Sequence, residues 1–178
     1  GLYAHQAGMG FMIRHVDYPG YAGDLSHQAV TIAEVMKAGG YRTYMCGKWH
    51  VAKSHNQKDG VENWPVQRGF DKFYGTIRGF GSFYDPETLC RQNKFITPEN
   101  DPEYKPDQFY YTEAITDNAI QFLRDDADKK EPFFMYVAYT AAHWPLQAPE
   151  KDIAKYKGRF DSGYDALRKE RFENLKKL

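Results

Sequence analysis

Three cationic side chains in this sequence, Lys48, His50 and His143, have the chemistry to bind an anionic ester and assist its cleavage. A sulfate or phosphate monoester presents oxygens that need hydrogen-bond donors, and its departing oxygen needs a proton. Lysine supplies a positive charge with three donors, and histidine can donate a hydrogen bond or act as a general acid near neutral pH. Most lysines lie at the surface and most histidines have structural roles, so residue type alone does not indicate a catalytic site. The placement of the three residues has to decide between these interpretations.

Each of these residues follows a segment that is predicted to be a β-strand. Residues 41–46 are rich in aromatic and β-compatible side chains, and the loop expected after them carries Lys48 and His50. The near-continuous apolar run 133–139 predicts an interior parallel strand that is covered on both faces, and His143 follows it. In open α/β sheets, ligands bind beyond the carboxyl ends of the strands. We therefore expect both segments to bring their cations to the same edge of one sheet.

Two segments predict helices next to these strands. Thr31 and Glu34 have the spacing of a capping box, which predicts a helix that starts at Thr31 and ends at the glycine pair 39–40. A second helix is predicted from a cap at Thr112 to the charged segment around Asp128, because apolar residues recur there at helical spacing.

The remaining segments complete the predicted architecture. Residues 54–111 are rich in Gly, Pro, Asn, Asp and aromatic residues, which predicts a long, partly irregular excursion with one short strand near 73–74. A charged helix is predicted over 161–178. The order of helix, strand, excursion, helix and strand is typical of an α/β domain with a mainly parallel sheet flanked by helices.

Composition limits the possible partners. The chain has 178 residues, of which 42% are hydrophobic, enough for one sizeable core. Its 24 basic and 24 acidic residues give a formal charge of +0, so no basic field favours nucleic acid or an anionic membrane. No apolar run approaches the ~20 residues of a membrane span. Cys46 in a strand and Cys90 in a polar loop are expected to be free thiols.

Residues 40–50 resemble a signature of the type I sulfatases, which belong to the alkaline phosphatase superfamily. The signature is Gly-Tyr-x-Thr, two residues, a small apolar residue and Gly-Lys-Trp-His; Cys46 stands where the family usually has Val or Ile. The similarity continues, in the order the family uses, through residues 1–9, 31–39, 68–75 and 132–146.

This resemblance implies an alkaline-phosphatase-like fold and the hydrolysis of sulfate esters of aryl or carbohydrate compounds. Lys48 and His50 would contact the sulfate, and His143 would contact it and assist the leaving group. The expected partner is a sulfated small molecule or glycan. The family's periplasmic, secreted or lysosomal locations are suggested for this protein as well.

The resemblance also implies a formylglycine nucleophile and a calcium ion. No Cys-x-Pro-Ser-Arg or Ser-x-Pro-Ser-Arg motif for that nucleophile occurs in the sequence, and the aspartate and Asp-Asn segments that hold calcium are missing too. We therefore expect residues 1–178 to be an incomplete central part of a sulfatase catalytic domain. Its calcium ligands would lie outside this chain, no metal site is predicted within it, and this stretch alone is expected to be inactive.

Two other functions stay open at the level of sequence. One is a phosphate or phosphonate ester hydrolase of the same superfamily, because cations that bind anions do not separate sulfate from phosphate strongly. The other is a noncatalytic module that binds sulfated glycans, which would fit the missing nucleophile motif and the 14 tyrosines.

Overall fold

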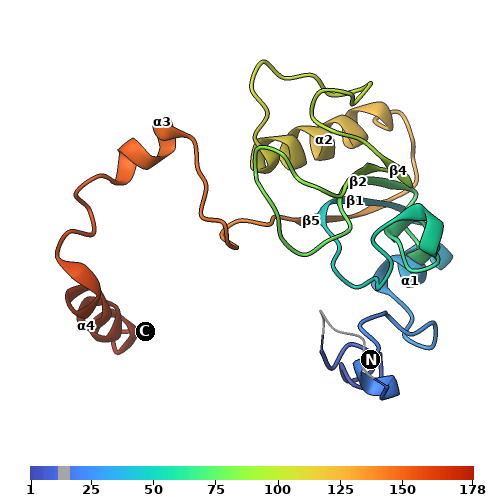
Figure 1. Ribbon diagram of the computed structural model, residues 1–178, viewed down its shortest axis with the longest axis horizontal. Helices are drawn as coiled ribbons and strands as arrows, with labels where there is room; N and C mark the ends of the chain where they lie inside the picture. Colours follow the sequence, from blue (N-terminus) through green and yellow to red (C-terminus); the bar gives the residue numbers. More distant parts are fainter. Residues whose placement is uncertain (12–16) are drawn as a thin grey trace. The chain divides into compact units, whose positions relative to one another are not determined.

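A five-stranded sheet organises residues 1–146 in the computed structural model, which describes residues 1–11 and 17–178 (Figure 1). The strands are β1 (Arg42–Lys48), β2 (Lys72–Thr76), β3 (Leu89–Arg91), β4 (Lys94–Phe95) and β5 (Phe133–Ala138). Their spatial order is β4-β3-β2-β1-β5. β1 pairs in parallel with β2 and β5, whereas the short strands β3 and β4 pair antiparallel. The prediction of an α/β fold with a mainly parallel sheet flanked by helices is confirmed.

Two helices pack on opposite faces of this sheet, α1 (Ile32–Ala38) and α2 (Tyr111–Asp125) (Figure 1). Successive side chains of β1 alternate between the faces. Tyr44 and Cys46 join the core under α2, and Met45 joins the core that includes Ala33 of α1. Both sides of β1 are therefore buried, which holds its backbone firmly in place.

The helix boundaries follow from local hydrogen bonds. The predicted capping box is confirmed, because Thr31 Oγ1 accepts from Glu34 N at 3.1 Å and the Glu34 carboxylate accepts from Thr31 N at 2.7 Å. α1 then ends at Gly39. The predicted cap at Thr112 is wrong: the N-cap is Tyr110, two residues earlier, and it makes no side-chain cap hydrogen bond, so α2 starts at Tyr111. At this start the Tyr111 N–H donates to the Phe83 carbonyl at 2.7 Å, and the Tyr111 side chain is buried.

β1 extends further than the sequence predicts, because it still includes Gly47 and Lys48. Gly47 lies opposite Gly75 in β2 and Ala138 in β5. A Cβ atom on Gly47 would lie 2.0 Å from the Ala138 carbonyl oxygen, and its φ is +117°. Glycine at this point lets the ladder continue to Lys48 instead of ending in a loop.

β5 is not the interior strand that its apolar run predicts. In the described part of the chain it pairs with β1 alone, at one edge of the sheet. Neither face of β5 is fully covered, because exposed side chains lie on both faces: Phe133, Tyr136 and Val137. An apolar run indicates that a strand suits burial, but it does not say which segment covers the strand.

The excursion 54–111 contains three strands, β2, β3 and β4, where one was predicted. β3 and β4 form a tight hairpin in which Gln92 adopts a φ of +55°. Cys90 lies buried in β3 and not in a polar loop. Cys46 and Cys90 are both free, as expected, and burial raises the pKa of the Cys46 thiol to about 12.

Residues 147–178 form a second compact unit. It contains α3 (Glu150–Ile153) and α4 (Gly163–Leu175), so the predicted C-terminal helix is present, and none of its residues is buried. Short 3-10 helices elsewhere span Pro19–Tyr21, Gln57–Asp59, Pro65–Arg68 and Ala154–Tyr156. Within the described ranges, no helix has the length and apolarity of a transmembrane segment.

Candidate active site

Lys48 and His50 lie at the carboxyl end of β1. Lys48 is the last residue of the strand, and its backbone pairs with that of Thr76 in β2. Beyond the strand, Trp49 N donates to the Thr76 carbonyl at 2.9 Å and His50 N donates to the Ile77 carbonyl at 3.0 Å. The Trp49 indole nitrogen donates inward to a backbone carbonyl at 2.6 Å. These bonds fix the segment and leave Lys48 and His50 half-buried on either side of Trp49.

His143 lies on the segment that follows β5. Its backbone N–H donates to the Thr140 carbonyl at 2.8 Å, and its side-chain Nδ1 lies 2.7 Å from the Trp144 carbonyl oxygen. A carbonyl oxygen only accepts, so Nδ1 must carry a proton in this contact. The exposed imidazole therefore keeps Nε2 for a ligand.

Lys48 and His143 lie near enough to His50 for their charges to act on it. Burial, followed by the positive charges of Lys48, His55 and His143, lowers the pKa of His50 below its ordinary value of 6.5. Burial also lowers the pKa of Lys48. Because β1, β2 and β5 are parallel, their carboxyl ends lie at one edge of the sheet, where Lys48, His50 and His143 meet.

The part of the chain that the structure describes offers these cations no acidic partner. Among residues 1–11 and 17–178, no carboxylate forms an ion pair with Lys48, His50 or His143. Buried cations elsewhere are paired, as in Arg68 with Glu34 at 2.9 Å. A group of two half-buried cationic side chains and one exposed histidine, with no counter-charge among the described residues, is suited to an anionic ligand.

The segment that follows β2 contributes residues that the sequence did not single out. An ideal Cβ on Gly79 would lie 2.2 Å from Cε1 and Nδ1 of His50, so this imidazole lies directly against the glycine. The Phe80 ring lies nearly parallel to the His143 ring, at 16° and with centroids 6.2 Å apart. His55 adds a further positive charge near His50. Recognising β2 as a core strand would have placed residues 77–80 at the same edge.

The comparisons with known proteins decide the family. A family model described as Sulfatase matches residues 1–177. The chain belongs to the sulfatase family. An uncharacterized sulfatase of Schizosaccharomyces pombe is 32% identical over 98% of this chain, and an arylsulfatase of Klebsiella aerogenes is 31% identical over 97% of it. The chain spans about a third of these relatives, 33% and 37% of their lengths.

Solved structures share the fold of this chain. The crystal structure of Ps i-CgsB in complex with k-i-k-neocarrahexaose has a TM-score of 0.62 and 29% identity, and it covers 85% of this chain and 34% of its own. A structure in complex with its substrate D-glucosamine-2-N,6-O-disulfate has a TM-score of 0.61 over 87% of this chain and 25% of its own, and at 24% identity it supports the fold alone. The resemblance to type I sulfatases is confirmed.

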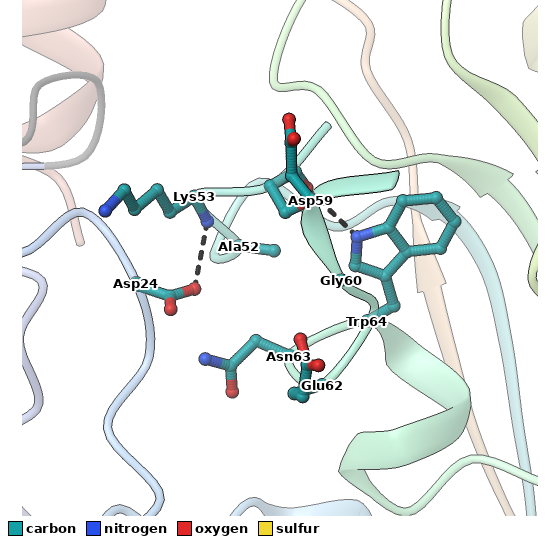
Figure 2. A pocket seen from close by; sticks show the side chains of 9 residues that line it. Asp24, Ala52, Lys53, Asp59, Gly60, Glu62, Asn63 and Trp64 are labelled. Atoms are coloured by element: carbon teal, nitrogen blue, oxygen red, sulfur yellow. Dashed lines mark hydrogen bonds between the residues drawn. The ribbon is translucent and has the colours of Figure 1, made fainter. Parts of the chain in front are cut away.

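A cavity of about 310 Å³ in this sulfatase-family chain lies beside the segment that follows His50 (Figure 2). Its lining includes the carboxylates of Asp24, Asp59 and Glu62, and Asp24 accepts from the backbone N–H of Lys53 at 2.9 Å. Such an acidic lining repels a sulfate ester. The cationic edge formed by Lys48, His50 and His143 is therefore the better candidate for the anion.

The described residues do not fit the calcium ion that the sulfatase resemblance implies. No three His, Cys, Asp or Glu side chains within residues 1–11 and 17–178 are grouped so that they could hold a metal ion. Calcium commonly takes six to eight oxygen ligands. The roles proposed below for this chain's residues therefore involve no metal-dependent step.

Proposed function

We propose that the protein containing this chain is a sulfuric ester hydrolase that cleaves sulfate esters of aryl or carbohydrate compounds. Lys48, His50 and His143 would supply part of its sulfate-binding site. The observation that carries this proposal is their convergence at one sheet edge, where no carboxylate of the described residues pairs with them, in a chain of the sulfatase family. The neocarrahexaose complex of a 29% identical relative supports a carbohydrate substrate.

Each residue has a distinct role in this proposal. Lys48 places its positive charge against the sulfate oxygens. His50, whose lowered pKa favours the neutral imidazole, donates one hydrogen bond to the same group. His143 already uses Nδ1–H at the Trp144 carbonyl, so it can donate a proton from Nε2 only as an imidazolium. That proton passes to the ester oxygen as its bond to sulfur breaks, and the alcohol or phenol leaves neutral.

The nucleophile is the remaining part of the proposal. Its motif is not among these 178 residues, so a formylglycine would come from the rest of the full-length protein. The experiments therefore use the full-length protein.

The first test compares turnover of carbohydrate and 4-nitrophenyl sulfates with turnover of the matching phosphates. Replacing Lys48, His50 or His143 by alanine is expected to lower kcat/KM by about 10²–10³ each, the usual cost of one lost donor to a developing charge. Lys58→Ala and His27→Ala are matched controls, because both residues are exposed and outside the site. Cleavage of phosphate esters without any sulfate ester would refute the proposal, and glycan binding that survives all three site substitutions would favour a binding module.

The proton-donor role of His143 has a sharper test. A 4-nitrophenolate ion leaves readily without a proton, whereas a sugar alkoxide does not. We expect His143→Ala to reduce kcat much more for a carbohydrate sulfate than for 4-nitrophenyl sulfate. Equal losses on both substrates would show that His143 only binds the anion.

A further inference from the structure

We propose that Phe80 is a specificity-determining residue of this site. The exposed face of its ring packs against the ring of the aryl or sugar group that carries the sulfate. This inference rests on the proposed function, because it assigns a contact to the organic part of the same ester. Neither the signature motif nor the placement of the cations points to Phe80. The argument comes from the segment that links β2 to the site.

The position of Phe80 beside His143 carries the first step. The two rings are nearly parallel, with an interplanar angle of 16° and centroids 6.2 Å apart, an offset stack of the kind aromatic pairs favour. His143 is the residue proposed to protonate the departing oxygen. A ring that flanks the proton donor therefore flanks the group attached to that oxygen.

The chain is anchored by hydrogen bonds on both sides of Phe80. Before it, Arg78 N donates to Thr88 Oγ1 at 2.9 Å, and Thr76 Oγ1 donates to the Arg78 carbonyl at 3.2 Å. After it, Ser82 Oγ accepts the backbone N–H groups of the residues two and three positions on, both at 3.1 Å. Phe80 lies between these anchors, which limits how far its ring can shift when a ligand arrives.

The space beneath Phe80 is nearly filled. A cavity of only about 10 Å³ lies between Phe80, Thr76 and Thr140, which is room for about one water molecule. The buried Thr140 hydroxyl has no hydrogen-bond partner among the described residues, and such a water would satisfy it. The Phe80 ring therefore cannot fold inward, and it stays at the surface.

The chemistry of the exposed surface indicates what it binds. Phe80 is 52% exposed although it is a large apolar side chain beside a cationic site. A flat apolar surface suits the face of an aryl ring or the C–H face of a pyranose, and it offers nothing to the sulfate itself. Phe80 should therefore affect the affinity for the organic group and not the affinity for the free anion.

The test uses Phe80→Ala, Phe80→Leu and Phe80→Trp in the full-length protein. We measure kcat and KM on 4-nitrophenyl sulfate and on a 6-sulfated hexosamine, together with the Ki of inorganic sulfate. Phe80→Ala and Phe80→Leu should raise KM roughly three- to tenfold, the range expected for one aromatic contact. Phe80→Trp should keep KM near the wild-type value, and the Ki of sulfate should stay unchanged in all three variants.

Phe133→Ala is the matched control. Phe133 is 48% exposed and also stacks on one aromatic ring, that of Tyr44, but it lies at the opposite end of β5 from the site. The change in its unfolding midpoint measures the stability lost with a half-exposed phenylalanine. Phe133→Ala should leave KM unchanged.

The outcomes separate this inference from the proposed function. An equal rise in KM and in the Ki of sulfate, or a Trp variant no better than Ala, would overturn the role of Phe80. An active wild-type enzyme whose Ala and Leu variants keep their KM would overturn it while leaving the sulfatase proposal intact. A wild-type protein that neither cleaves sulfate esters nor binds sulfate would overturn both.

Discussion

Replacing Gly79 by alanine tests whether His50 has to remain where the structure places it. The new Cβ would lie 2.2 Å from Cε1 and Nδ1 of the imidazole and 2.4 Å from Cγ, whereas ordinary contacts begin at 3.4 Å. Gly79 does not have the left-handed backbone that disfavours alanine. The added methyl group therefore acts on the imidazole of His50 and not on the chain.

The size of the effect follows from these distances. The imidazole has to retreat by about 1 Å, and a misplacement of that size costs about 10²-fold in rate. We expect kcat/KM for a carbohydrate sulfate to fall by this factor. His50 is half-buried and can swing toward solvent, so the free energy of unfolding should fall by less than about 1.5 kcal/mol. Steady-state kinetics and urea unfolding of the full-length protein measure the two quantities.

A double-mutant cycle decides whether the effect runs through His50. In a His50→Ala background the clashing atoms are absent, so Gly79→Ala should cost nothing further. Gly39→Ala is the control for the glycine-to-alanine change, because the atom nearest to its new Cβ would be the Met36 carbonyl oxygen at 3.3 Å, away from the site. If Gly79→Ala lowered kcat/KM equally in the wild-type and His50→Ala backgrounds, or if Gly39→Ala lowered it as much, the effect would not act through the His50 imidazole.

Three further predictions concern charge and strand packing. Burial and neighbouring cations hold the pKa of His50 below 6.5, so protonation of His50 opposes folding in the empty site. A bound sulfate favours protonation, and the Ki of sulfate should therefore fall as the pH drops from neutrality toward this lowered pKa. This dependence should flatten in His50→Gln, and a wild-type Ki without pH dependence would contradict it. Burial raises the pKa of Asp126, but hydrogen bonds from two lysines and Tyr44 outweigh burial and hold this pKa well below 3.8. The ionised Asp126 carboxylate therefore stabilises the fold above pH 3.8, and this stabilisation is lost as the pH falls further. Asp126→Asn should lower the free energy of unfolding in urea by about 1.5–3 kcal/mol at pH 7, and the difference from wild type should vanish in acid. A difference that stays the same at every pH would argue against this role of Asp126. Gly47→Ala should cost roughly 2–6 kcal/mol, since its Cβ would lie 2.0 Å from the Ala138 carbonyl at a φ of +117°, and a variant with wild-type unfolding would rule out this close approach.

The elements that the sequence predicted well have signals within a few residues. The reciprocal hydrogen bonds of Thr31 and Glu34 involve only neighbours, so their spacing was enough to place the start of α1. The end of β1 depends on pairing with β2 and β5, and Gly47 suggested a loop because glycine more often marks a turn than a close contact between strands. The environment of β5 depends on which segments cover it, and a run of apolar residues does not contain that information.

The candidate site divides in the same way. Lys48, His50 and His143 were predictable because each follows a run of strand-forming residues, and parallel strands share one carboxyl edge. Phe80 lies after β2, which the sequence predicted only as one short strand near 73–74 inside a long, irregular excursion. Its relation to His143 arises only when β2 and β5 lie on either side of β1, so no local pattern could indicate it.

Cationic side chains in this fold are of two kinds: those paired with carboxylates hold segments together, and those at the carboxyl edge remain available for an anion. Arg68 and Arg91 are almost completely buried, and each is held by a carboxylate, at 2.9 Å from Glu34 and 2.7 Å from Asp101. These pairs tie segments together, and losing one partner would leave a buried charge uncompensated. The cations at the carboxyl edge repel one another instead, and this repulsion adds to burial, the larger cause, in lowering the pKa of His50. A sulfate ester bound there would supply the missing negative charge, so the same repulsion that weakens the empty site would strengthen its hold on substrate.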